Sequence, residues 1–119
     1  MKKLVFALVL LFAGIAYASP TGGDGLMLNG VTATGPSATV ITELYQNIDA
    51  QVWSASGSVA TVTLECRTLP SAPWYPCQTV TNPDATGKYF NLARAYAYRW
   101  NVTAYSSGTI YASIVRYTD

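Results

Sequence analysis

The chain has 119 residues with seven Lys or Arg, six Asp or Glu and no His, so its formal net charge is +1. Without clustered positive charge it is a poor candidate for nucleic-acid binding. The absence of His excludes the Ser–His and Cys–His pairs of nucleophilic catalysis, and its two Cys cannot by themselves complete a structural zinc site.

The first 18 residues have the pattern of a secretory signal peptide. Lys2 and Lys3 precede an apolar run, Leu4 to Ala16, that is too short to span a bilayer comfortably. The Ala-Tyr-Ala sequence that ends at Ala18 predicts cleavage before Ser19. An uncleaved membrane anchor is the alternative. Cleavage would leave 101 residues with a net charge of −1, enough for one exported domain that does not span a membrane.

Composition predicts the class of the exported part. Only 11% of the residues are charged, and Thr, Ser, Ala, Val and Tyr are abundant, which is typical of an all-β domain. Residues 19–25 are rich in Gly and are predicted to be a flexible N-terminal segment. Residues 26–119 are predicted to form a single domain.

The first half of that domain predicts three strands. Residues 26–33 form a short strand interrupted by Asn29-Gly30, which favours a turn or a bulge. Gly35-Pro36 predicts a turn. Residues 39–44 are rich in β-branched side chains, and residues 48–56 alternate apolar and polar positions as a strand with one buried face does.

The middle of the chain predicts a strand, a loop and a further strand. Residues 59–68 alternate again. Residues 69–76 contain three prolines and are predicted to be a loop, followed by a strand over 77–81. Residues 82–87 have the composition of a turn, and residues 89–93 lead into the next strand.

The stretch 95–105 is the most strongly patterned of the chain. Its even positions form an apolar face, consisting of Tyr96, Tyr98, Trp100, Val102 and Ala104. A strand this long and this aromatic should lie in the middle of a sheet. Ser106 to Gly108 predicts a hairpin turn into a last strand over 109–117.

Together these patterns predict about eight short strands. No helical apolar period follows residue 18. Strands at this spacing favour an antiparallel β-sandwich, immunoglobulin-like or jelly-roll-like, and an open barrel is the alternative.

Cys66 and Cys77 are the only cysteines, and in a secreted protein two cysteines most often pair. Their disulfide would staple the two ends of the Pro-rich loop. Closing a ring of about a dozen residues contributes roughly 3 kcal/mol in the chain-entropy model. Two buried free thiols are the alternative.

The carboxylates give little indication of catalysis. Asp49, Glu65 and Asp84 are the candidates for a glycosidase pair, but each lies in a turn or on the polar side of a strand, where a solvated carboxylate is the ordinary finding. Asp84 could also contribute to a calcium site, although a role in the turn fits its surroundings better. We therefore predict that the chain is not an enzyme and that it holds no metal or cofactor.

Three aromatic residues are the candidates for contact with a ligand or partner. Trp74 and Tyr75 lie at the tip of the predicted loop, where exposed rings could anchor a sugar or a protein. Trp53 lies on the otherwise polar face of its strand and could join them. In the alternative interpretation, Trp74 folds back and covers the open end of the sandwich.

The order of strand and turn motifs resembles a known family. These motifs are Asn-Gly-Val-Thr-Ala-Thr-Gly after Leu28, Ile-Asp-Ala-Gln-Val-Trp-Ser-Ala-Ser-Gly, Ala-Thr-Val-Thr-Leu-Glu-Cys, a Pro-Trp loop and a final Tyr-Arg-Trp-Asn-Val-Thr-Ala-Tyr-Ser-Ser-Gly-Thr-Ile. The pattern resembles the soluble second chain of split type IV pilins, the geopilin domain 2 type. It is also similar to small β-sandwich modules on virion surfaces.

The pilin resemblance implies a non-catalytic structural subunit, exported to the cell surface or periplasm. It implies docking on a short helical pilin-type chain that supplies the spine of an extracellular filament. The sequence departs from ordinary pilins because it carries no prepilin leader and no hydrophobic helix after the predicted cleavage site. The alternative is a free secreted module that binds a glycan or a protein through its loop aromatics.

Overall fold

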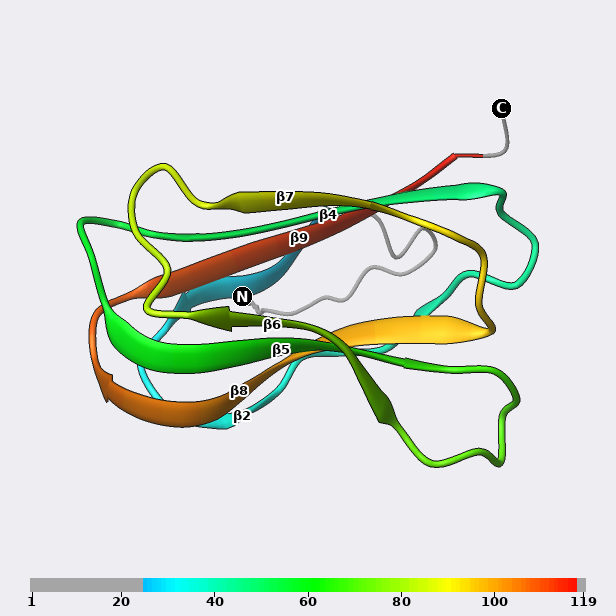
Figure 1. Ribbon diagram of the computed structural model, residues 1–119, viewed down its shortest axis with the longest axis horizontal. Helices are drawn as coiled ribbons and strands as arrows, with labels where there is room; N and C mark the ends of the chain where they lie inside the picture. Colours follow the sequence, from blue (N-terminus) through cyan, green and yellow to red (C-terminus); the bar gives the residue numbers. More distant parts are fainter. Residues whose placement is uncertain (1–24, 118–119) are drawn as a thin grey trace, which may run out of the picture.

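Two antiparallel sheets face each other in the computed structural model, which describes residues 25–117 (Figure 1). The four-stranded sheet has the order β1 (Gly25–Val31), β9 (Ile110–Tyr117), β4 (Asn47–Ser54) and β7 (Lys88–Leu92). The five-stranded sheet has the order β2 (Gly35–Pro36), β8 (Ala97–Ser107), β5 (Val59–Arg67) and β6 (Tyr75–Thr81), and β3 (Val40–Ile41) also pairs with β8. The predicted all-β sandwich is confirmed.

The described residues contain no helix, so none of them forms a helix able to cross a membrane. The predicted signal peptide, its cleavage site between Ala18 and Ser19, and all but the last residue of the 19–25 segment lie outside the described residues.

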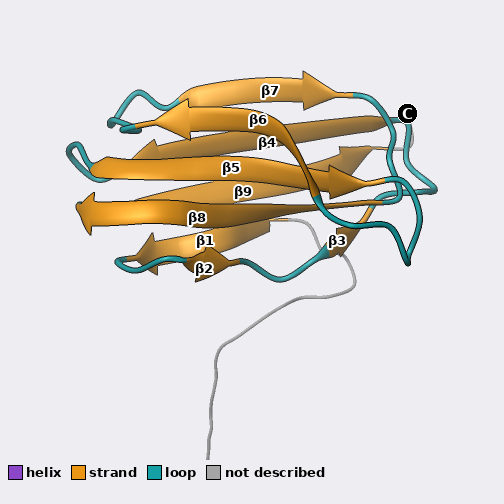
Figure 2. Ribbon diagram, turned by 60° about the horizontal axis from the view of Figure 1, so that its bottom comes forward, coloured by secondary structure: helices purple, strands orange, loops and turns teal. Residues whose placement is uncertain are grey.

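Consecutive strands mostly belong to different sheets. Among the described strands, β5 and β6 are the only pair that is adjacent both in sequence and in a sheet. The disulfide between Cys66 and Cys77 joins the ends of these two strands, as predicted, with 6.0 Å between the Cα atoms. Figure 2 shows the two sheets as two layers, with β5, β6 and β8 in front of β4, β9 and β1.

The turn at Ser106 to Gly108 does not form a hairpin, and that prediction is wrong. It carries the chain from β8 in one sheet to β9 in the other. The reason is that both strands have a strongly apolar face, and the two faces meet across the sandwich. Trp100 of β8 is fully buried and its indole Nε1 donates a hydrogen bond to the carbonyl oxygen of Ser113 in β9, at 3.1 Å.

The core consists of the inward positions of the strands, as their alternation predicts. Ile48, Val52, Val62 and Leu64 are completely inaccessible to solvent, and Ile110, Ala112 and Ile114 of β9 are as well. Ala60 is buried with them, and Cys66 packs against this cluster. The outward positions of β4 include Trp53, which keeps the unusual placement that the sequence indicates.

The alternation of β8 is broken near its end. Val62 pairs with Val102, whereas the preceding Thr61 pairs with Ala104, so Thr103 is an extra residue in β8. Such a bulge reverses which side chains face inward. Ala104 is therefore exposed and Tyr105 packs against the core instead, which corrects the predicted face of this strand.

Other boundaries also differ from the prediction. Gly35-Pro36 is not an isolated turn but a short strand, β2, that pairs with Val102 and Asn101. The predicted strand over 39–44 is reduced to β3, and β6 already begins at Tyr75. Pro76 is tolerated there because β6 is an edge strand, where a missing N–H need not cost a ladder bond.

The segment after the 82–87 turn forms β7 in the four-stranded sheet and does not continue into β8. The turn itself is as predicted. The Asp84 Oδ1 accepts hydrogen bonds from the backbone N–H groups of Thr86 and Gly87, at 3.1 and 2.9 Å. Asp84 thus has the turn-stabilising role that its sequence context indicates.

Candidate functional site

Trp74 folds back onto the outer surface of the five-stranded sheet. Its indole ring lies against the guanidinium groups of Arg67 and Arg99, with 4.4 and 4.3 Å between each guanidinium carbon and the ring centroid. The ring is half-buried, whereas the neighbouring Tyr75 is 67% exposed. The loop therefore presents Tyr75 to solvent and uses Trp74 for packing on the molecule's own surface.

A polar network holds one of these arginines, Arg99, in place. The Nε of Arg99 donates to Oε1 of Glu65 at 2.7 Å, and Nδ2 of Asn101 donates to Oε2 of the same carboxylate at 3.1 Å. The Nε of Arg67 is buried without a hydrogen-bond acceptor among the described residues. Planar guanidinium groups stack well on aromatic rings, so this cluster fixes the position of Trp74.

Trp53 lies on the opposite side of the molecule. It belongs to β4 and stacks on Tyr111 of β9, with ring centroids 5.7 Å apart and an interplanar angle of 11°. Gly87 passes close to the backbone of β4 at Trp53, where a side chain would not fit. A Cβ at Gly87 would lie 2.8 Å from the Cβ of Trp53 and 2.5 Å from the carbonyl oxygen of Val52. The three aromatic candidates therefore do not form one site, because the sandwich separates Trp53 from Trp74 and Tyr75.

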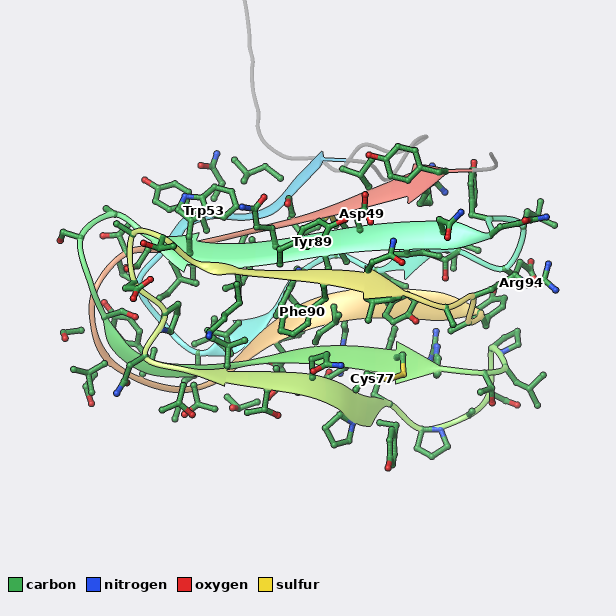
Figure 3. All side chains as sticks on the ribbon, turned by 45° about the horizontal axis from the view of Figure 1, so that its top comes forward. Asp49, Trp53, Cys77, Tyr89, Phe90 and Arg94 are labelled. Carbon is green, nitrogen blue, oxygen red and sulfur yellow. A yellow bond between two sulfur atoms is a disulfide. The ribbon has the colours of Figure 1, made fainter. Side chains whose placement is uncertain are left out.

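Around Trp53 the outward side chains of β4, β7 and β9 form a continuous surface, which we call the aromatic face. It comprises Asp49, Gln51, Trp53, Tyr89, Asn91, Tyr111 and Ser113. Figure 3 shows Asp49, Trp53 and Tyr89 on this outer side, while Phe90 lies between the sheets, where it packs against the core. The face is thus a mixture of aromatic rings and hydrogen-bonding groups.

Asp49 organises the centre of the aromatic face. Its Oδ1 accepts hydrogen bonds from the Tyr89 hydroxyl at 2.8 Å and from Nδ2 of Asn91 at 2.7 Å. The hydrogen bond to Asp49 raises the pKa of Tyr89 above its ordinary value, with further contributions from desolvation and from the negative charge of Asp49. Tyr89 and Asn91 were missed by the sequence analysis. Their alternation in 88–92 was a signal, but it does not identify β4 as the neighbouring strand.

The carboxylates considered for catalysis are far apart in the fold. Asp49 is on the outer face of the four-stranded sheet, Glu65 on the outer face of the five-stranded sheet, and Asp84 in a turn. Within residues 25–117, no group of three or more Asp, Glu or Cys side chains is arranged to hold a metal ion.

One end of the sandwich carries exposed aliphatic side chains. Of the five exposed Leu, Ile and Val side chains among the described residues, three lie where β5 finishes and β4 begins. These side chains are Ile41, Leu44 and Leu69, which are 39%, 79% and 60% exposed. We call the surface that they form the aliphatic end. This end is on the right in Figure 1.

The fold and surfaces define a domain of the β-sandwich class. No protein-family model matches the sequence, and no curated protein sequence matches it. The crystal structure of the SPBc2 prophage-derived protein YomS is similar, with a TM-score of 0.59 over 87% of this chain and 99% of YomS. The two sequences are 9% identical, so this similarity establishes a shared fold only.

Proposed function

We propose that this chain is a non-catalytic, exported structural subunit that docks on a short helical pilin-type partner in an extracellular filament. The observation that supports this proposal is the aliphatic end. Isolated apolar side chains are ordinary on a protein surface, but three large aliphatic side chains gathered at one end are a feature of contact surfaces.

The aliphatic end is held by hydrogen bonds that link its segments. The backbone N–H of Thr42 donates to the carbonyl oxygen of Tyr96, and the N–H of Tyr96 donates to that of Arg67. These bonds connect the chain beside Ile41 to the end of β5 just before Leu69. Because these bonds already order the backbone, docking would cost little backbone entropy.

A helical partner suits this surface chemically. The apolar stripe of an amphipathic helix presents side chains at every third or fourth position and can pack on a small aliphatic platform. Full burial of each Leu or Ile side chain contributes about 1.5–3 kcal/mol. The described part of the chain has no helix of its own, so the partner would supply the helical spine of the filament.

The test begins with surface filaments sheared from the producing cells and identified by mass spectrometry. We expect the chain in stoichiometric amounts with a short helical pilin. Replacing Leu44 and Leu69 together by Asp should remove the chain from the filaments, because docking would then bury two charges. Val59→Asp is the matched control, since Val59 is 54% exposed at the opposite end of β5.

Two results would overturn the proposal. One is recovery of the wild-type chain only in the periplasm or free in the medium. The other is filament incorporation that the Leu44 and Leu69 double variant leaves unchanged, with both variants folded by circular dichroism.

A further inference from the structure

We propose that the aromatic face of the four-stranded sheet binds a neutral polysaccharide chain. This site is separate from the aliphatic end and does not depend on the filament proposal. The aromatic face combines one exposed and two half-buried rings with a pre-arranged carboxylate and amide groups on a regular sheet, and these are the groups that recognise uncharged sugar rings.

Strand register places the groups of the face in rows. Trp53 of β4 is opposite Tyr111 of β9. In the next row, two residues before Trp53 along β4, Gln51 lies between Tyr89 of β7 and Ser113 of β9. In the third row, Asp49 lies between Asn91 of β7 and Val115 of β9. Rings at one end and along one side thus border a centre of hydrogen-bonding groups.

The rings supply surfaces for the apolar C–H faces of pyranose sugars. Tyr89 is 60% exposed and stands on the edge strand β7, where a ligand can reach it. Trp53 is half-buried and held by its stacking on Tyr111, so its orientation is already fixed. Rigid aromatic groups with an apolar body and a polar tip contribute large contact area at low entropic cost.

The polar groups supply acceptors and donors for sugar hydroxyls. Two hydrogen bonds hold the Asp49 carboxylate through Oδ1, and Oδ2 receives none from the described residues. Oδ2 can therefore accept from a hydroxyl group of the ligand. The same bonds hold Tyr89 and Asn91 in place, and the exposed amide of Gln51 lies beside them. Charge-assisted hydrogen bonds of this kind are stronger than neutral ones.

The charge of the face identifies the class of sugar. Asp49 is the only charged side chain among the described outward positions of β4, β7 and β9, and it is negative. An acidic polysaccharide would be repelled by this carboxylate and would find no cation among those positions. The distance from Trp53 to Asp49 along β4 is four residues, or about 13 Å, which fits roughly two to three sugar rings. The ligand is therefore an uncharged chain rather than a single sugar.

The experiment is affinity electrophoresis of the protein purified from the producing cells. The gels contain mixed-linkage β-glucan, xyloglucan, galactomannan or arabinoxylan, and a parallel set contains the acidic polymers alginate and polygalacturonate. We expect at least one neutral polymer to retard the protein and neither acidic polymer to do so. Tyr89→Ala and Asp49→Ala should weaken the retarding interaction at least tenfold.

The matched control is Tyr75→Ala, which removes a similarly exposed tyrosine from the other sheet. It should bind as the wild-type protein does. Because Asp49→Ala could disturb folding, Asn91→Ala on the edge strand is a second variant, and circular dichroism confirms that each variant is folded. Amide chemical shifts measured on addition of the retarding polymer's oligosaccharide should change on β4, β7 and β9.

Three results would overturn the proposal. These are no retardation by any of the four neutral polymers, retardation by the acidic polymers only, and binding that Tyr75→Ala weakens as much as Tyr89→Ala does.

Discussion

At the scale of single residues, Trp74 illustrates how an aromatic side chain in a surface loop can be used for stability. Its ring contacts two guanidinium groups, and the network around Glu65 holds one of them. Each such contact contributes about 0.5–1 kcal/mol at an exposed site and more when water is excluded. The adjacent Tyr75 points to solvent and is the natural comparison.

Trp74→Ala should therefore lower the free energy of unfolding by about 2 kcal/mol, from the lost ring contacts and the lost burial. For a domain of this size the corresponding decrease in Tm is about 8–16 °C. Tyr75→Ala should change Tm by only a degree or two. Thermal unfolding of both variants, followed by circular dichroism, measures the difference. Equal Tm values for the two variants would contradict this account of Trp74.

The buried hydroxyl of Tyr98 should make the free energy of unfolding depend on pH in the alkaline range. Tyr98 is buried, its hydroxyl donates to the carbonyl oxygen of Ala93 at 2.6 Å, and burial raises its pKa above the ordinary value of about 10. Since the folded-state pKa exceeds the unfolded one, the contribution of Tyr98 to stability is complete below about pH 10. It is lost as pH rises through the folded-state pKa.

Tyr98→Phe should consequently lower stability at pH 7 by about 1 kcal/mol, the contribution of one hydrogen bond. At pH 11 the difference between the variant and the wild type should shrink or reverse, because Phe has no proton to lose. Urea unfolding at the two pH values measures both differences. The same difference at pH 7 and pH 11 would show that Tyr98 does not cause the alkaline loss.

At the scale of elements, the β5–β6 hairpin is the one pair of described strands adjacent both in sequence and in a sheet, and the disulfide closes it. The two cysteines are 11 residues apart in sequence. Replacing both by Ser should lower the free energy of unfolding by roughly 3 kcal/mol, because the unfolded chain regains the freedom that the ring removes. Chemical denaturation of the double variant measures this, and mild reduction of the wild-type protein should produce the same decrease. A double variant as stable as the wild type would contradict it.

The strands themselves were largely predictable from the sequence, because alternation is a local property. Residues 59–68 and 109–117 became β5 and β9 with the expected buried faces. The prediction failed where a tertiary contact decides the conformation. Because of the bulge at Thr103, Tyr105 packs against the core in place of the predicted Ala104. The bulge is caused by the pairing of β8 with β5 rather than by the local sequence.

At the scale of the whole molecule, alternation shows which side chains face inward but not which strands are neighbours. The sequence placed Trp53 on an outward position, yet its partner Tyr111 lies 58 residues further along the chain. Asp49 and Tyr89 are likewise 40 residues apart. For this reason the aromatic face could not be predicted, and the three aromatic candidates were grouped although the sandwich separates them.

The pairing of β1 with β9 also constrains the order in which the chain can fold. Among the described strands β9 is the only neighbour of β1, and it also pairs with β4. A chain that emerges with its N-terminus first therefore cannot complete the four-stranded sheet until β9 has been made. Until then β4 and β7 form only an isolated pair, and two-stranded pairs are marginal in water. The five-stranded layer can assemble from strands that all precede β9, so the second layer of the sandwich is the later one to close during synthesis.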